Sequence, residues 1–147
     1  MTKEEVVRSF QSGFDCGQTV LRHCAAALGL DEKTAGRIST GFGGGSGRGE
    51  TCGAVIGAYL ALGLKYGCDE TGEAGAEQKV RWMKKNAEFC EKFQAKYPGF
   101  TCREILGVDL STPEGRKQNQ ERQLTANLCP QLVADVTAWL DEILTED

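Results

Sequence analysis

The chain reads Gly41-Phe-Gly-Gly-Gly-Ser-Gly-Arg-Gly49 and continues as Glu50-Thr-Cys-Gly-Ala-Val-Ile-Gly57. The first part holds six glycines in nine residues, which favours a loop, because glycine reaches backbone conformations that other residues avoid. The second part opens an apolar segment that predicts a helix to about Tyr66. Since a glycine inside a helix costs about 0.5–1 kcal/mol relative to alanine, Gly53 and Gly57 predict that another backbone closely approaches this central helix.

Helix signals recur on both sides of this stretch, and no segment alternates between apolar and polar residues as a half-buried strand does. Capping boxes stand at Thr2 and Thr101, and Thr112 with Pro113 marks another helix start. The predicted helices cover 2–10, 16–28, 32–40, 51–66, 76–97, a short segment from 101, 113–122 and 130–144. We therefore expect one all-α domain over 1–147, a compact bundle of about four long helices plus short ones, with the glycine-rich loop before a central helix.

The predicted helix 76–97 carries apolar residues three and four positions apart, which is typical of a face turned towards a core. This stripe consists of Val80, Met83, Ala87, Cys90, Phe93 and Tyr97. Three further aromatic residues lie on secondary helix faces, where they are candidates for a homodimer contact: Trp82, Phe89 and Trp139.

The composition excludes some classes of function. A net charge of -4 argues against nucleic acid, because binding phosphates requires a basic face. The N-terminus has acidic residues where a signal peptide needs basic and then apolar ones. The longest apolar stretch, 54–64, is shorter than the roughly 20 residues that span a bilayer. We therefore expect no membrane insertion and a cytoplasmic location, where cysteines are reduced, metal-bound or catalytic.

The seven cysteines divide into two groups. Three have ordinary structural explanations, as core positions inside helices or as a loop residue: Cys24, Cys90 and Cys68. The other four each lie at a predicted helix start, with apolar residues three or four positions later: Cys16, Cys52, Cys102 and Cys129. Free N–H groups at a helix start lower the pKa of a thiol from about 8.5 towards roughly 3.5–7.5. These four thiols therefore predict cysteine chemistry at one site inside the bundle.

Four stretches together support a resemblance to a known family: Ser12-Gly-Phe-Asp-Cys16, the glycine loop leading to Thr51-Cys-Gly-Ala-Val-Ile-Gly57, Thr101-Cys102, and Cys129-Pro130. Over most of its length the chain resembles the putative redox-active proteins named for a C…GCAxxG…C…C pattern. It reads Thr-Cys-Gly-Ala where the family name spells Gly-Cys-Ala. The resemblance implies redox activity through the four cysteines.

Two redox chemistries fit these four residues. Four thiolates are the common ligand set of an iron–sulfur cluster, so Cys16, Cys52, Cys102 and Cys129 are candidate metal ligands in an electron-transfer protein. The same residues are the candidate catalytic thiols of an oxidoreductase that works by metal-free thiol–disulfide exchange. The lack of a C-x-x-C pair lowers the case for structural zinc. The redox partner is an unknown protein or small molecule.

A third alternative is an anion- or phosphate-binding module built on the glycine-rich loop. The loop nearly matches a phosphate-binding motif, but Glu50 occupies the position of its lysine, and a carboxylate repels phosphate. We therefore expect the loop to present backbone N–H groups to the sulfurs. The candidate cofactor-binding residues are Gly43, Gly44, Gly45 and Gly53.

Overall fold

The computed structural model describes all 147 residues, and its regular elements are helices. The α-helices are α1 (Lys3–Gln11), α2 (Cys16–Ala25), α3 (Glu32–Ile38), α4 (Gly53–Tyr66), α5 (Gly72–Gln94), α6 (Cys102–Leu106), α7 (Pro113–Arg122) and α8 (Leu124–Ile143). A 3-10 turn covers Ala26–Leu28, and a compact turn with several left-handed residues covers Gly45–Gly49. The only β-type pairing is an isolated bridge between Thr51 and Thr101. The prediction of an all-α fold is confirmed.

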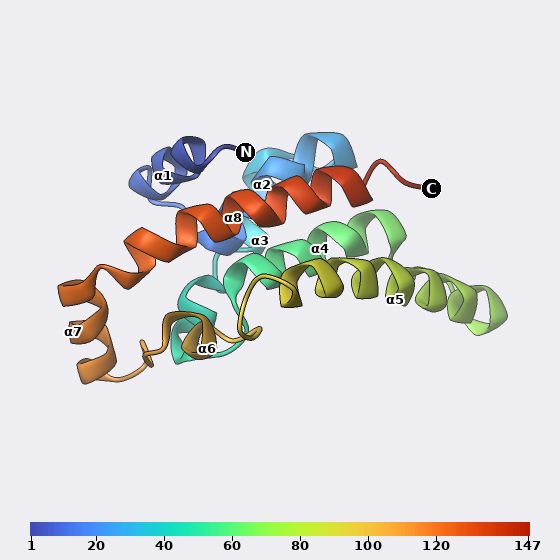
Figure 1. The fold of residues 1–147 in the computed structure, drawn as a ribbon. Coiled ribbons are helices and arrows are strands. Elements are labelled where there is room, and N and C mark those ends of the chain that lie inside the picture. The colour runs from blue at the N-terminus through green and yellow to red at the C-terminus, as the bar shows by residue number, and fades with distance from the viewer.

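The central helix α4 packs against α2, α5 and α8, and Figure 1 shows α4, α5 and α8 running lengthwise beside one another. The close approach predicted from Gly53 and Gly57 is made by α2. A Cβ on Gly57 would lie 2.9 Å from the Cβ of Val20 and 3.0 Å from the carbonyl oxygen of Gly17. Any side chain at this position would therefore push α2 away from α4.

One hydrophobic core of 21 buried residues joins α1, α2, α3, α4, α5 and α8. Its largest fully buried side chains include Tyr66, Phe89 and Phe93. The Tyr66 hydroxyl donates a hydrogen bond of 2.6 Å to the carbonyl oxygen of Ile143 at the end of α8. None of the helices combines the length and the apolar character needed to cross a lipid bilayer.

The buried face of α5 differs from the predicted stripe. Val80 is 51% and Met83 is 62% exposed, and Ala87 is exposed as well, whereas Phe89 and Phe93 are fully buried. The physical reason is the size of the aromatic side chains, because a phenylalanine buries about 150–250 Å², more than a valine or an alanine can. The helix is therefore rotated to bury Phe89.

This orientation of α5 removes one of the proposed dimer contacts. The prediction that Phe89 is available to a second copy is wrong, since its side chain is enclosed by the core. Trp82 and Trp139 are half-buried, and their rings pack at steep angles against Tyr59 and Phe89 within the same chain. These two indoles thus contribute to the core of their own molecule.

The start of the last helix also differs from the prediction. α8 begins at Leu124 and contains Pro130 in its interior, so Cys129 lies in the second turn and not at a helix start. Gln123, with a left-handed φ of 51°, separates α7 from α8. The other three positions were predicted correctly, because Cys16 and Cys102 are the first residues of α2 and α6, and Cys52 directly precedes α4.

Candidate functional site

A cavity of about 380 Å³ lies between the starts of α2, α4 and α6 and the first half of α8. Four of the seven cysteines line it: Cys16, Cys52, Cys102 and Cys129. The other three, Cys24, Cys68 and Cys90, lie elsewhere. The structure therefore brings together the four cysteines that were proposed as site residues. No group of three or more histidine, cysteine, aspartate or glutamate side chains is arranged to hold a single metal ion.

Cys16 is held at the start of α2 by a capping box, in which the Asp15 carboxylate accepts a hydrogen bond from the N–H of Gln18 at 2.9 Å. Its sulfur lies against the backbone of Gly53. A Cβ on Gly53 would come within 2.4 Å of the Cys16 Sγ and 2.7 Å of the Phe42 carbonyl oxygen. Only glycine fits beside this sulfur, and Gly53 directly follows Cys52.

Cys52 and Cys102 are brought together by the bridge between Thr51 and Thr101. The N–H of Cys52 donates to the carbonyl of Phe100, and the N–H of Cys102 donates to the carbonyl of Glu50, both at 2.7 Å. The bridge thus holds both cysteines at the cavity wall.

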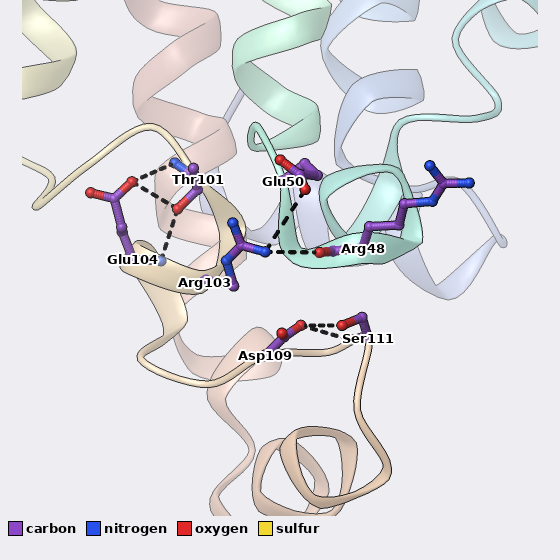
Figure 2. A network of polar contacts seen from close by, with 7 residues as sticks. All are labelled: Arg48, Glu50, Thr101, Arg103, Glu104, Asp109 and Ser111. Carbon is purple, nitrogen blue, oxygen red and sulfur yellow. Dashed lines mark hydrogen bonds and ion pairs between the residues drawn. The ribbon is translucent and has the colours of Figure 1, made fainter.

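A polar network on the outside of this bridge connects α6 with the glycine-rich loop (Figure 2). The Arg103 guanidinium donates to the Arg48 carbonyl oxygen at 3.3 Å and pairs with the Glu50 carboxylate at 3.8 Å. Figure 2 also shows the capping box of α6, formed by Thr101 and Glu104. Exposed ion pairs contribute only about 0–1 kcal/mol. The backbone bonds and the cap therefore hold Cys102 more firmly than the Arg103 ion pair does.

The glycine-rich loop winds through a left-handed turn, because four successive residues from Gly44 to Gly47 have positive φ, including Ser46 at 58°. This turn brings Gly44 and Gly45 to the cavity wall. A Cβ on Gly45 would lie 3.0 Å from the Cβ of Cys102 and 2.4 Å from the N of Glu50. The loop thus packs the bare backbone of Gly45 directly against Cys102.

The four glycines proposed to bind a cofactor do not all reach the cavity. Gly44, Gly45 and Gly53 line it. Gly43 packs against Asp15 instead, because a Cβ on Gly43 would lie 2.8 Å from the Asp15 Oδ2. The N–H of Gly44 acts on Cys16 and favours its thiolate, and the N–H of Gly43 acts in the same way on the Asp15 carboxylate. These two N–H groups therefore stabilise negative charge on side chains of the protein itself, Cys16 and Asp15.

Burial controls the acidity of the four thiols. It raises the pKa of Cys16 to about 12 and that of Cys52 and Cys102 to about 11, and it raises the pKa of Cys129 as well. Repulsion from the other cysteines adds to the rise, while N–H groups in the first turn of α4 oppose it at Cys52. The predicted lowering of these pKa values is wrong, because loss of solvation outweighs the helix-start N–H groups.

The remaining residues that line the cavity are mostly apolar, and the sequence pattern after two of the cysteines identifies some of them. Ile105, Leu106, Leu132 and Val133 line the cavity, and they are the apolar residues three and four positions after Cys102 and Cys129. Sequence reasoning missed five others, which come from other elements and carry no local signal: Phe10, Phe14, Leu110, Thr125 and Ala126. Burial raises the pKa of Asp15, the one carboxyl group at the cavity.

Comparison with known proteins yields one match. The model of a family described as "Putative redox-active protein (C_GCAxxG_C_C)" matches residues 14–143, a range that contains all four cavity cysteines and the glycine-rich loop. No curated protein and no solved structure matches the chain significantly.

Proposed function

Because the chain belongs to the family of putative redox-active proteins with the C_GCAxxG_C_C pattern, we propose that its four cavity cysteines form one electron-transfer site. In this proposal, Cys16, Cys52, Cys102 and Cys129 are the ligands of an iron–sulfur centre. The observation that carries it is the convergence of these four cysteines, from the starts of α2, α4 and α6 and from α8, on one cavity. A cluster bound there supplies reversible one-electron transfer.

The donor set fits such a group. Four cysteine thiolates are the common ligands of both two-iron and four-iron clusters. Cys52 and Cys102 both open onto the cavity next to the Thr51–Thr101 bridge, which suits a group that contacts both sulfurs. The N–H groups of Gly44 and of the first turn of α4 face the sulfurs and stabilise negative charge there.

The raised pKa values support coordination over a free nucleophilic thiol. A thiol whose pKa is about 11 or 12 stays protonated at neutral pH, and only a thiolate attacks a disulfide at a useful rate. A metal cation offsets the cost of deprotonation, because a coordinating thiol is bound as the thiolate. Without such a cation, four adjacent thiolates would repel one another in a poorly solvated cavity.

The test is anaerobic purification followed by iron and sulfide analysis, visible absorption and electron paramagnetic resonance. We expect wild-type protein to carry iron, and serine substitution of any one of Cys16, Cys52, Cys102 or Cys129 to remove most of it. The matched controls Cys68→Ser and Cys90→Ser lie outside the cavity and should keep the iron content and spectrum of the wild type. A colourless wild-type protein without iron, even after reconstitution with iron and sulfide, would contradict the proposal.

One contact favours the metal-free alternative, thiol–disulfide exchange. The Cys16 sulfur lies against Gly53, immediately after Cys52, so these two cysteines are the candidate pair. Their two thiols would form one disulfide and release two protons and two electrons to a redox partner protein or a small molecule. Counting free thiols in metal-free protein after mild oxidation tests this alternative, and peptide mapping identifies the pair. Unchanged thiols would exclude it.

A cytoplasmic location accords with this site. All seven cysteines are free thiols in the structure, and the cytoplasm is the compartment that keeps thiols reduced or bound to metal. The proposal therefore places both the protein and its redox partner in that compartment, and fractionation of the native cells tests it.

A further inference from the structure

We infer that the cysteine cavity binds a small, uncharged and mainly apolar molecule beside the four sulfurs. This inference rests on the proposed function and deepens it, because it names the class of substrate with which the redox site exchanges electrons. Its support is the size, the lining and the opening of the cavity.

The size of the cavity suits a small organic molecule. Its volume of about 380 Å³ lies within the range of roughly 300–1,000 Å³ found for small-molecule sites, which are mostly apolar with a few polar groups. The cysteines line only part of the wall. Apolar side chains from other elements line the rest, among them Phe10 of α1, Phe14 and Leu110.

The lining disfavours anions. No lysine, arginine or histidine lines the cavity, so a phosphate, carboxylate or sulfonate would lose its hydration without gaining an opposite charge. Burying an unpaired ion in apolar surroundings is far more costly than burying an uncharged group. Nucleotides and other anionic metabolites are therefore poor candidates.

Cations are disfavoured because the only carboxyl group at the cavity is already engaged. Asp15 accepts the hydrogen bond from Gln18 that caps α2, and the N–H groups of Gly17 and Gly43 also act on its carboxylate. Binding a cation there would compete with the cap that positions Cys16. An uncharged molecule avoids both costs, and the Thr125 hydroxyl in the wall is a hydrogen-bonding group for one polar atom on it.

The opening lies at the start of α8. Ala126 is the one exposed residue of the lining, so it marks the rim of the cavity. Its small side chain leaves the entrance clear. A bulky side chain here would obstruct the entrance while leaving the core unchanged.

Two probes of equal ring size test the inference. The uncharged probe is 2-naphthol and the anionic probe is naphthalene-2-sulfonate, and equilibrium dialysis at neutral pH measures their binding to the protein as purified anaerobically. We expect 2-naphthol to bind roughly tenfold or more tightly than the sulfonate. Equal affinity for the two probes, or no binding of 2-naphthol, would overturn the inference.

A pair of variants locates the bound probe. Ala126→Trp should weaken 2-naphthol binding by roughly tenfold, whereas Ala138→Trp, an exposed position on the same helix outside the cavity, should leave binding unchanged. Circular dichroism checks that both variants fold. Binding to Ala126→Trp at wild-type affinity would place the probe elsewhere and overturn the inference.

Iron analysis of the same samples separates this inference from the proposed function. If the protein contains iron and fails to bind 2-naphthol, the inference is wrong and the iron–sulfur proposal stands. The inference is also wrong if loading iron abolishes the binding of 2-naphthol completely. Protein that binds 2-naphthol at the cavity and takes up no iron would retain the binding site and contradict the iron–sulfur proposal.

Discussion

Gly53 shows at the scale of one residue how closely the site is packed. Its Cα faces both the Cys16 sulfur and the carbonyl oxygen of Phe42, and a methyl group would come closer to each than atoms normally approach. The glycine is therefore needed for two reasons. It leaves room for the Cys16 sulfur at the cavity, and it allows the close contact between α2 and α4.

We predict opposite effects for two Gly→Ala substitutions in α4. Gly53→Ala should destabilise the protein by about 1–3 kcal/mol, the usual cost of overpacking, and should expose Cys16 to alkylation. Gly63→Ala, where a Cβ meets nothing within 4 Å, should stabilise it by about 0.5–1 kcal/mol. Urea unfolding measures both. Similar stability changes in the two variants would show that the contact with Cys16 is not tight.

At the scale of elements, α6 depends on its cap. The helix has only five residues, and a helix this short is not stable without help from its surroundings. The reciprocal hydrogen bonds of Thr101 and Glu104 satisfy N–H groups at its start. They hold Cys102 at the first position of the helix, beside the bridge to Thr51.

Removing that cap should loosen Cys102 in particular. We expect Thr101→Ala to cost about 0.5–2 kcal/mol and to speed the alkylation of Cys102 by iodoacetamide in metal-free protein, followed by mass spectrometry. Thr112→Ala is the matched control, since it removes the corresponding cap from α7. If both substitutions speed the reaction of Cys102 equally, the cap of α6 has no special role at the site.

At the scale of the whole molecule, burial of thiols makes stability depend on pH. Burial raises the pKa of Cys24 to about 12 and that of Cys52 to about 11, whereas a thiol in an unfolded chain titrates near about 8.5. Below that value both states keep their protons. Above it, the unfolded chain releases protons that the folded protein retains, so the free energy of unfolding falls as pH rises.

We therefore predict that metal-free protein has nearly constant stability up to about pH 8 and loses stability between about pH 8.5 and pH 11. Each fully buried thiol contributes up to about 1.4 kcal/mol per pH unit over this range. Urea unfolding at a series of pH values measures the slope. Cys24→Ala has one such thiol fewer and should show a shallower fall. A stability that rises with pH above 8.5 would contradict the raised pKa values.

Local chemistry in the sequence predicted much of this molecule. Capping residues placed the starts of α2 and α6, and the end of the glycine-rich loop placed that of α4, which together give the positions of Cys16, Cys52 and Cys102. Such signals work because a cap is satisfied by residues three positions away. The small residues of α4 likewise predicted a close helix contact.

Only the tertiary structure decided the properties that depend on distant neighbours. Pro130 resembles a helix start in the sequence, yet α8 extends through it to Leu124. The face that α5 buries follows from competition between aromatic and smaller side chains for the core. The cavity and the raised thiol pKa values arise from residues on α1, α6 and α8 that shield the sulfurs from water. Local patterns position a cysteine on its helix, but solvation is set by everything packed around it.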